Sequence, residues 1–304
     1  MLMVTGAGGY LGSALVALAV REGRDVRAVV RDAQRAAAVL PPGVDVAVAD
    51  LADEEALARA ARGCTGVLHA AGAVGGTAEQ TRWANVEGTR RALEAAVAAG
   101  AERFVLTSSS AAIIDADGVV AEEPAGPPAL TDPYSTSKAA AEALVLADGR
   151  IETVVACPTG IYGPSPRGPE SYNELLLAAA RGDEPVIVDS RVGWVLAEDA
   201  AAGHLLALDR GEPGRRYVLC GEAASFGRVL HAFADRTGGR RVETLPPGAT
   251  LPDGAGTFAR RSEVYGKFPP VRVDDSGARA LGYAPRGVDE GIAITADWLG
   301  PALS

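Results

Sequence analysis

Short apolar runs alternate with segments of helical periodicity through the first half of the chain, and this alternation limits the fold more than any other feature. Strand-like runs occupy residues 2–5, 26–30, 44–49, 66–69, 104–107 and 151–156. Helical patterns between strands are typical of βαβ units and a parallel sheet. Because the runs are almost wholly apolar, we expect helices to cover both faces of that sheet. The sequence therefore predicts an α/β protein with a doubly wound parallel sheet.

The pattern changes after Pro158. A loop rich in proline and glycine follows at 163–169, and further proline-rich loops occur near 246–252 and 269–270. We therefore expect residues 1–160 to form the sheet core, with core elements returning near 185–210. Residues 161–304 are predicted to form mainly a smaller, irregular C-terminal lobe. The helices expected in the two parts cover residues 13–21, 54–61, 85–99, 133–147, 172–181, 200–209 and 226–237.

Charge and cysteine usage exclude several classes of protein. The 304 residues include 29 Lys and Arg against 39 Asp and Glu, a net charge of −10, so neither a nucleic acid nor an anionic membrane is an expected partner. Three widely spaced cysteines in apolar surroundings and three scattered histidines predict core residues rather than a metal site. No apolar stretch approaches the ~20 residues of a membrane span, and the first residues lack a basic, apolar leader. We expect a cytoplasmic protein without a metal.

A glycine-rich loop lies where the first predicted strand gives way to the first helix. Gly6, Gly9 and Gly12 have the spacing GxxGxxG, with Gly8 as a fourth glycine. A pyrophosphate must approach bare backbone N–H groups at a helix N-terminus, and the third glycine lets the helix pack closely on the sheet. In this context the loop predicts a dinucleotide-binding fold of the Rossmann type.

The end of the second strand indicates which dinucleotide binds. Arg31 follows the last apolar residue, and Arg35 lies one helical turn further on. A guanidinium can clasp a ribose 2′-phosphate with two hydrogen bonds, which favours NADP. Two alternatives stay open: Asp32 could turn inward and bond the ribose of NAD, or Arg31 could be a solvated charge.

Asp50 and Leu51 follow the third predicted strand. The carboxylate can accept a hydrogen bond from the amine of an adenine while the leucine covers the ring. Alternatively, Asp50 is the N-cap of the helix that starts near Asp53.

A tyrosine and a lysine lie four residues apart at the start of an alanine-rich helix. Asp132 is predicted as the N-cap of this helix and Pro133 as its first residue, so Tyr134 and Lys138 share one face. An ammonium close to a phenol lowers the pKa of the phenol toward neutral pH. The hydroxyl side chains at 107–110 end a strand at the edge where ligands bind in open α/β sheets. They could hydrogen-bond a substrate carbonyl as negative charge develops on its oxygen.

With these motifs the sequence resembles the extended short-chain dehydrogenases/reductases, that is, NAD(P)-dependent epimerase/dehydratase and dihydroflavonol-reductase-like proteins. The resemblance runs nearly end to end. The motifs that carry it are TGAGGYLG, ADLAD, HAAG, NVEGT, FVLTSS, YSTSK and CPTGIYGP.

The resemblance implies a role for each matching residue. Tyr134 would be the general acid/base, Lys138 would bond the nicotinamide ribose and tune the tyrosine, and Ser109 would orient the substrate carbonyl. Arg31 matches the basic residue of members that prefer NADP. The remaining cofactor contacts would come from Gly6, Gly9, Tyr10, Leu11, Gly12, Asp50, Leu51, Ala70, Ala71, Asn85, Pro158 and Ile161.

Two departures bear on the reaction. Dehydratase members place an acidic pair where this chain has Ser110-Ala111, which disfavours sugar-nucleotide dehydration, and Leu196 replaces a usual histidine. The leading hypothesis is therefore NADPH-dependent reduction of a small-molecule ketone or aldehyde, or oxidation of the alcohol. The alternatives are an NAD-dependent nucleotide-sugar epimerase and a non-catalytic NADP-sensing protein. A homodimer is compatible with all three.

Overall fold

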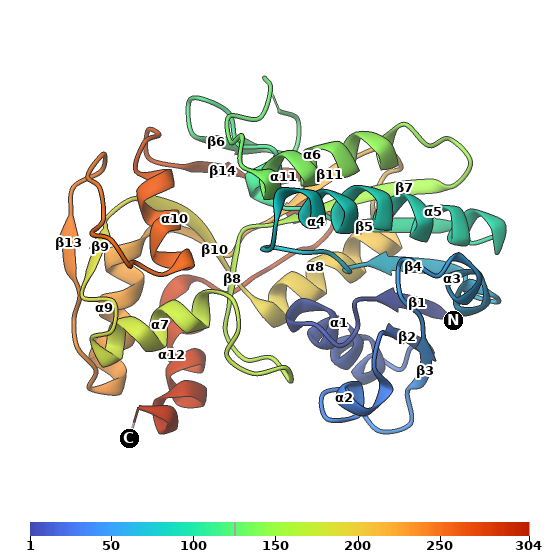
Figure 1. Ribbon diagram of the computed structural model, residues 1–304, viewed down its shortest axis with the longest axis horizontal. Coiled ribbons are helices and arrows are strands. Elements are labelled where there is room, and N and C mark those ends of the chain that lie inside the picture. Colours follow the sequence, from blue (N-terminus) through green and yellow to red (C-terminus); the bar gives the residue numbers. More distant parts are fainter. Residues whose placement is uncertain (125, 304) are drawn as a thin grey trace.

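A computed structural model describes residues 1–124 and 126–303. Over these residues seven strands, all parallel, form one sheet in the order β11-β7-β5-β4-β1-β2-β3, which lies on the right of Figure 1. Its strands are β1 (Leu2–Thr5), β2 (Val26–Val30), β3 (Asp45–Val48), β4 (Gly66–His69), β5 (Arg103–Thr107), β7 (Glu152–Pro158) and β11 (Arg216–Leu219). The predicted α/β fold with a doubly wound parallel sheet is confirmed.

Helices pack on both faces of this sheet and make two separate hydrophobic cores. One face is covered by α5 and α6, and the other by α1 and α8, as Figure 1 shows. The helices of this part are α1 (Tyr10–Arg21), α2 (Ala33–Ala37), α3 (Glu54–Ala61), α4 (Ala78–Arg82), α5 (Gly88–Ala98), α6 (Pro133–Leu146) and α8 (Ala197–Arg210), with the short turns η1 (Trp83–Glu87) and η2 (Ser110–Ala112). Burial on both faces accounts for the apolar inner strands, whereas the edge strand β3 is largely exposed.

The second lobe lies beyond the carboxyl ends of the strands, on the left of Figure 1. This lobe contains the third hydrophobic core of the protein. In it Trp194 packs edge-on against Phe226 and Tyr172, with ring centroids 5.1 and 5.0 Å apart. Its elements are β8 (Gly160–Tyr162), β9 (Val186–Val188), β10 (Arg191–Leu196), β12 (Glu222–Ser225), β13 (Glu243–Leu245), α7 (Tyr172–Arg181), α9 (Phe226–Thr237), α10 (Thr257–Tyr265), α12 (Val288–Leu299) and η3 (Gly300–Ala302). A separate pair joins β6 (Val119–Ala121) to β14 (Arg272–Asp274), which is followed by α11 (Ser276–Ala280).

The helix predicted at 85–99 differs from what the structure contains. The helical segment already begins at Ala78, where Thr77 and Gln80 form a reciprocal capping box. It then widens into the single π-helical turn η1 before α5. Asn85 lies in that turn and is buried, which matters for the site below. None of the helices in the described ranges is long and apolar enough to cross a membrane.

Candidate active site

Two glycines of the loop between β1 and α1 are packed too closely to admit a side chain. A Cβ on Gly12 would lie 2.0 Å from the carbonyl oxygen of Gly6, and a Cβ on Gly6 would lie 2.7 Å from the backbone of Ala71. Gly6 also has a φ of +66°, which favours glycine. Gly9 is the N-cap of α1 and makes no side-chain cap hydrogen bond. The loop therefore fits a dinucleotide pyrophosphate.

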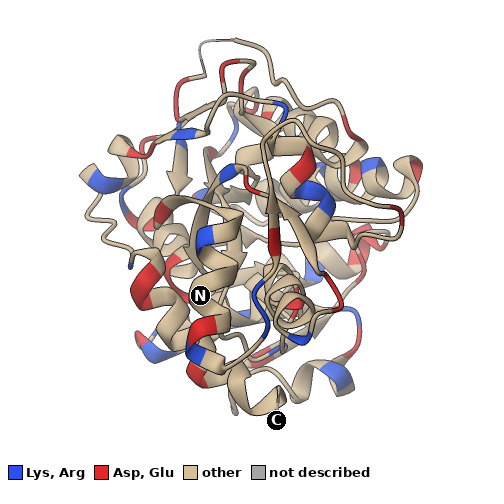
Figure 2. Cartoon of the chain, turned by 90° about the vertical axis from the view of Figure 1, so that its left-hand side faces the viewer, with Lys and Arg blue, Asp and Glu red and all other residues tan. Residues whose placement is uncertain are grey.

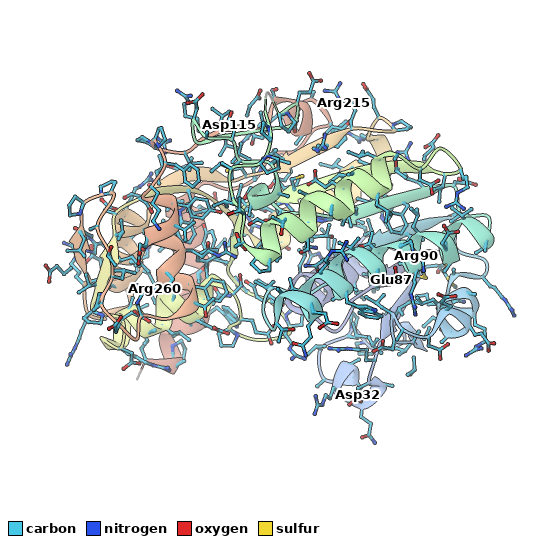
Figure 3. The ribbon with its side chains drawn as sticks, turned by 45° about the horizontal axis from the view of Figure 1, so that its top comes forward. Asp32, Glu87, Arg90, Asp115, Arg215 and Arg260 are labelled. Carbon is cyan, nitrogen blue, oxygen red and sulfur yellow. The ribbon has the colours of Figure 1, made fainter. Side chains whose placement is uncertain are left out.

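At the end of β2 the acidic side chain caps a helix. The Asp32 carboxylate accepts hydrogen bonds of 2.9 and 3.1 Å from the backbone N–H groups of Gln34 and Arg35, and so begins α2. Figure 3 shows Asp32 on this small outer helix. Arg31 is exposed, and within residues 1–124 and 126–303 it makes no ion pair.

The open alternative at Asp50 is resolved by the caps. Asp53 is the N-cap of α3, where its carboxylate accepts from the Ala56 N–H at 2.9 Å. Asp50 instead closes its own turn by accepting from the Ala52 N–H at 2.8 Å and is exposed. Asp50 and Leu51 thus lie on the loop after β3, where the sequence predicts adenine contacts.

Asn85 ties the loop after β4 to α6. Its side-chain amide exchanges two 2.9 Å hydrogen bonds with the backbone of Ala73 and donates a third, also 2.9 Å, to Ser137. A Cβ on Gly72 would lie 2.6 Å from the Asn85 amide oxygen and 3.2 Å from Lys138 Nζ. Asn85 therefore holds the loop that follows Ala70 and Ala71 against the lysine.

Tyr134 and Ser109 come together as the sequence predicts. Asp132 is the N-cap of α6 and Pro133 stands in its first turn, which confirms both predictions about the start of the helix. Ser109 follows β5 and caps η2, and its hydroxyl lies near enough to Tyr134 to act on the pKa of the phenol. Both side chains are partly buried on the wall of one cavity.

The predicted direction of the Tyr134 pKa is wrong. Burial raises the pKa of this phenol, and the neighbouring Ser109 hydroxyl and the positive charge of Arg261 only partly oppose that rise. Lys138 does not supply the main opposing charge, because its Nζ is directed to the carbonyl oxygen of Thr107, to which it donates a 2.9 Å hydrogen bond. The phenol therefore stays protonated at neutral pH in the absence of a ligand.

Lys138 is buried close to an acidic side chain, Glu142, of its own helix. Burial lowers the pKa of Lys138 to about 8, while the carboxylate of Glu142, one turn further along α6, acts to raise it. Glu142 is itself buried, accepts a hydrogen bond from Ser108 and pairs with Arg216 at 2.7 Å. The sequence did not predict this polar network, whose carboxylate stabilises the positive charge on Lys138.

The cavity joins these residues to the second lobe. Its volume is about 450 Å³, and it extends from the glycine-rich loop past Lys138 and Tyr134 to the C-terminal lobe. The predicted residues Tyr10, Leu11, Ala70, Pro158 and Ile161 line it. From the second lobe it is lined by residues that the sequence did not single out: Glu170, Ser171, Tyr172, Glu174, Phe258, Arg261 and Tyr265.

Tyr10 lines the cavity, and its hydroxyl is hydrogen-bonded to the second lobe. Its hydroxyl donates to the carbonyl oxygen of Gly163 at 2.6 Å and accepts from Asn173 at 2.8 Å. The tyrosine thus joins α1 to the loop and helix of the second lobe. Because the hydroxyl is engaged in these bonds, the part of Tyr10 available to contact a cofactor is its ring.

A Rossmann-type sheet, a glycine-rich phosphate loop and a Tyr-Lys helix beside a strand-end serine together define an NAD(P)-dependent oxidoreductase of the extended short-chain dehydrogenase/reductase type. The model of the NAD dependent epimerase/dehydratase family matches residues 2–220. The chain belongs to this family.

Relatives and solved structures agree with that placement. The chain is 35% identical to a putative dihydroflavonol 4-reductase of Synechocystis sp., over 77% of this chain and 72% of that protein. It is 30% identical to sterol demethylase protein B of Methylococcus capsulatus, over 97% of each. The structure of MoeE5 in complex with UDP-glucose and NAD superposes with a TM-score of 0.79, at 29% identity over 100% of this chain and 99% of the other.

Proposed function

We propose that the protein reduces a ketone or aldehyde with NADPH, and that Tyr134 donates the proton. The observation that carries the proposal is that Ser109, Tyr134 and Lys138 line one cavity, which also extends to Tyr10 and Leu11 at the start of α1. Similarity to a putative reductase and to an NAD-bound protein supports the same reaction class.

Each group has a defined task in this mechanism. When bound, the dihydronicotinamide supplies a hydride for the carbonyl carbon. Ser109 donates a hydrogen bond to the carbonyl oxygen, where negative charge develops, and Tyr134 transfers its proton to that oxygen. The raised pKa of Tyr134 suits this direction, because the phenol is protonated before the reaction begins. Lys138, buried beside the loop that Asn85 holds, is placed to bond the ribose.

The charges around the cavity favour a carbonyl compound over a nucleotide sugar, the substrate class of the alternative epimerase. A nucleotide sugar brings a diphosphate of its own, which cationic side chains would stabilise. Among the described residues that line the cavity, the cations are Lys138 and Arg261, and the acids Glu170 and Glu174 also line it. Figure 2 likewise shows acidic and basic residues interspersed on the visible face.

Substitution of Tyr134 by Phe tests the proposal. We expect Tyr134→Phe to lower kcat by at least ~100-fold, since the variant lacks the proton donor, with NADPH affinity largely retained. Stopped-flow NADPH oxidation with a panel of ketones and aldehydes measures the first quantity, and fluorescence titration the second. Turnover near the wild-type rate would remove Tyr134 from the mechanism. NADPH binding without oxidation by any carbonyl would favour a non-catalytic protein.

The preference for NADPH rests on Arg31. The Asp32 carboxylate is engaged at its own helix, which disfavours a bond to a ribose hydroxyl: one oxygen accepts both cap hydrogen bonds and the other lies 3.4 Å from Arg35 Nε. We expect Arg31→Gln to weaken NADPH binding about 10- to 100-fold and to leave NADH binding within a few-fold, as measured by calorimetry. NADH is the internal control, and equal losses for both cofactors would contradict the assignment.

A further inference from the structure

Arg261 is an arginine beside the reacting phenol that belongs to neither the phosphate loop nor the catalytic helix. It comes from α10 of the second lobe, and its Cζ lies 5.7 Å from the centroid of the Tyr134 ring. The side chain is 19% exposed and lines the cavity. Its charge therefore lies where a substrate of Tyr134 must bind.

The donors of this guanidinium are not used by the protein. The nearest acid is Asp132, whose oxygen is 3.7 Å away, and Arg261 makes no hydrogen bond to any described residue. The Asp132 carboxylate is already engaged as the cap of α6, since it accepts from Ser135 Oγ at 2.6 Å and from the N–H of Tyr134 at 3.2 Å. The guanidinium is partly buried, and its free donors are available to a ligand that accepts from them.

The adjacent Arg260 shows the contrast. Its guanidinium donates to Glu263 at 2.8 Å and to the carbonyl oxygens of Leu251 and Pro252 at 3.0 and 2.6 Å. Figure 3 labels it in the second lobe. Arg260 has a structural task within its own lobe, whereas Arg261 has none.

Aromatic side chains surround the rest of this end of the cavity. Tyr172, Phe258 and Tyr265 line it, and the rings of Tyr172 and Phe258 are 5.0 Å apart. Of the two acids that line it, Glu170 is paired with Arg167 at 2.7 Å. The other acid, Glu174, is exposed and has no ion pair among the described residues. This end of the cavity therefore offers a largely aromatic wall and one planar cation, with Glu174 at its exposed side.

We infer that the substrate is an oxo acid, whose carboxylate binds Arg261 while its apolar or aryl substituent packs on Tyr172, Phe258 and Tyr265. A guanidinium matches a carboxylate with two parallel hydrogen bonds. Because Arg261 lies over the same ring whose hydroxyl protonates the carbonyl, few carbon atoms separate the two groups of the substrate. This inference rests on the proposed carbonyl reduction and specifies its substrate class.

The test compares acids with their neutral esters. Benzoylformate and benzoylpropionate, each beside its methyl ester, are reduced with NADPH by the wild-type protein and by Arg261→Gln. We expect kcat/KM for the acids to fall about 10- to 100-fold in the variant while the esters change little, so that the acid-to-ester ratio collapses. Arg260→Gln is the matched control and should keep the wild-type ratio. Thermal melts of both variants check that the lobe is folded.

The outcomes separate this inference from the proposed function. An acid-to-ester ratio that is the same in wild type and Arg261→Gln, with turnover that still needs Tyr134, overturns the oxo-acid assignment alone. Equal losses on acids and esters also overturn it, because they would give Arg261 a role on the phenol instead. The absence of turnover with acids, esters and simple ketones overturns the carbonyl reduction on which the inference rests.

Discussion

At the scale of single residues, the site contains ionisable side chains whose burial disfavours their charged form. Lys138 has a pKa of about 8 instead of the ordinary 10.5 because burial disfavours its charge. Its single hydrogen bond to the Thr107 carbonyl only partly compensates. Such a lysine lowers the stability of the protein without ligand. A binding or catalytic role explains why it is present.

Lys138→Met should therefore inactivate the protein and stabilise it. A shift from 10.5 to about 8 corresponds to roughly 3 kcal/mol at most, less the lost hydrogen bond, so we expect a gain on the order of 1–2 kcal/mol at pH 7. The folded pKa of this base is lowered, so its cost is complete below about pH 8 and disappears as pH rises toward 10.5. Urea unfolding without cofactor measures the difference between the two proteins, which should shrink over that interval. A variant less stable than wild type at pH 7 would contradict this account.

At the scale of secondary-structure elements, the close packing of β1 and α1 depends on particular glycines of the phosphate loop. Gly12 has backbone atoms of Gly6 where its Cβ would be, whereas a Cβ on Gly8 would meet only the Val30 side chain at 3.7 Å. We expect Gly12→Ala to weaken NADPH binding more than ~100-fold, because α1 must move away from the loop, and Gly8→Ala to change it by a few-fold at most. Fluorescence titration measures both. Similar affinities in the two variants would show that the close approach is unimportant.

The elements that the sequence predicts well are those with a local signal. The strands of the large sheet are continuous apolar runs, and α6 begins at Asp132 and Pro133, as expected from their capping chemistry. The helix that starts at Ala78 was missed because its alanine and polar residues carry no apolar periodicity, and its start depends on the Thr77 cap.

The second lobe could not be predicted in the same way. Arg260 and Arg261 are adjacent and chemically identical, and only the packing of α10 against the cavity separates a structural arginine from one that lines it. The direction of the Tyr134 pKa depends similarly on burial, which has no local sequence signal. Helix spacing places Tyr134 and Lys138 on one face, but it does not show that Lys138 Nζ is bonded to Thr107.

At the scale of the whole molecule, the site lies where the two lobes meet, and charged groups join them there. Arg286, before α12, pairs with Asp199 at 2.6 Å and with Glu198 at 2.7 Å in the first turn of α8, the helix that packs on the sheet. On the opposite face of the sheet, the exposed pair Arg90 and Glu87, 2.7 Å apart, lies within one helical segment, as Figure 3 shows. Ion pairs of the first kind join the segment before α12 to α8 and so connect the second lobe to the sheet core.

Two buried histidines connect the layers of the sheet core. His69, at the end of β4, hydrogen-bonds Thr5 of β1 at 2.7 Å and Thr89 of α5 at 3.1 Å. His204 of α8 hydrogen-bonds Thr107 of β5 at 3.0 Å. Burial lowers the pKa of His69 to about 3 and that of His204 to about 4, so both imidazoles are neutral in the folded protein.

These imidazoles should make the protein sensitive to acid well before its carboxylates are protonated. Below pH ~6.5 the unfolded chain binds protons that the folded chain refuses, so stability falls as pH drops toward 4, by about 1.4 kcal/mol per pH unit for each imidazole. Urea unfolding at pH 7.5, 6.5, 5.5 and 4.5 measures the slope. His204→Gln removes one titrating group and should lower the slope by about one proton, whereas His231→Gln, at a partly exposed position of α9, is the matched control. A slope that His204→Gln leaves unchanged would mean that carboxylates, rather than the histidines between sheet and helices, set the acid limit of the fold.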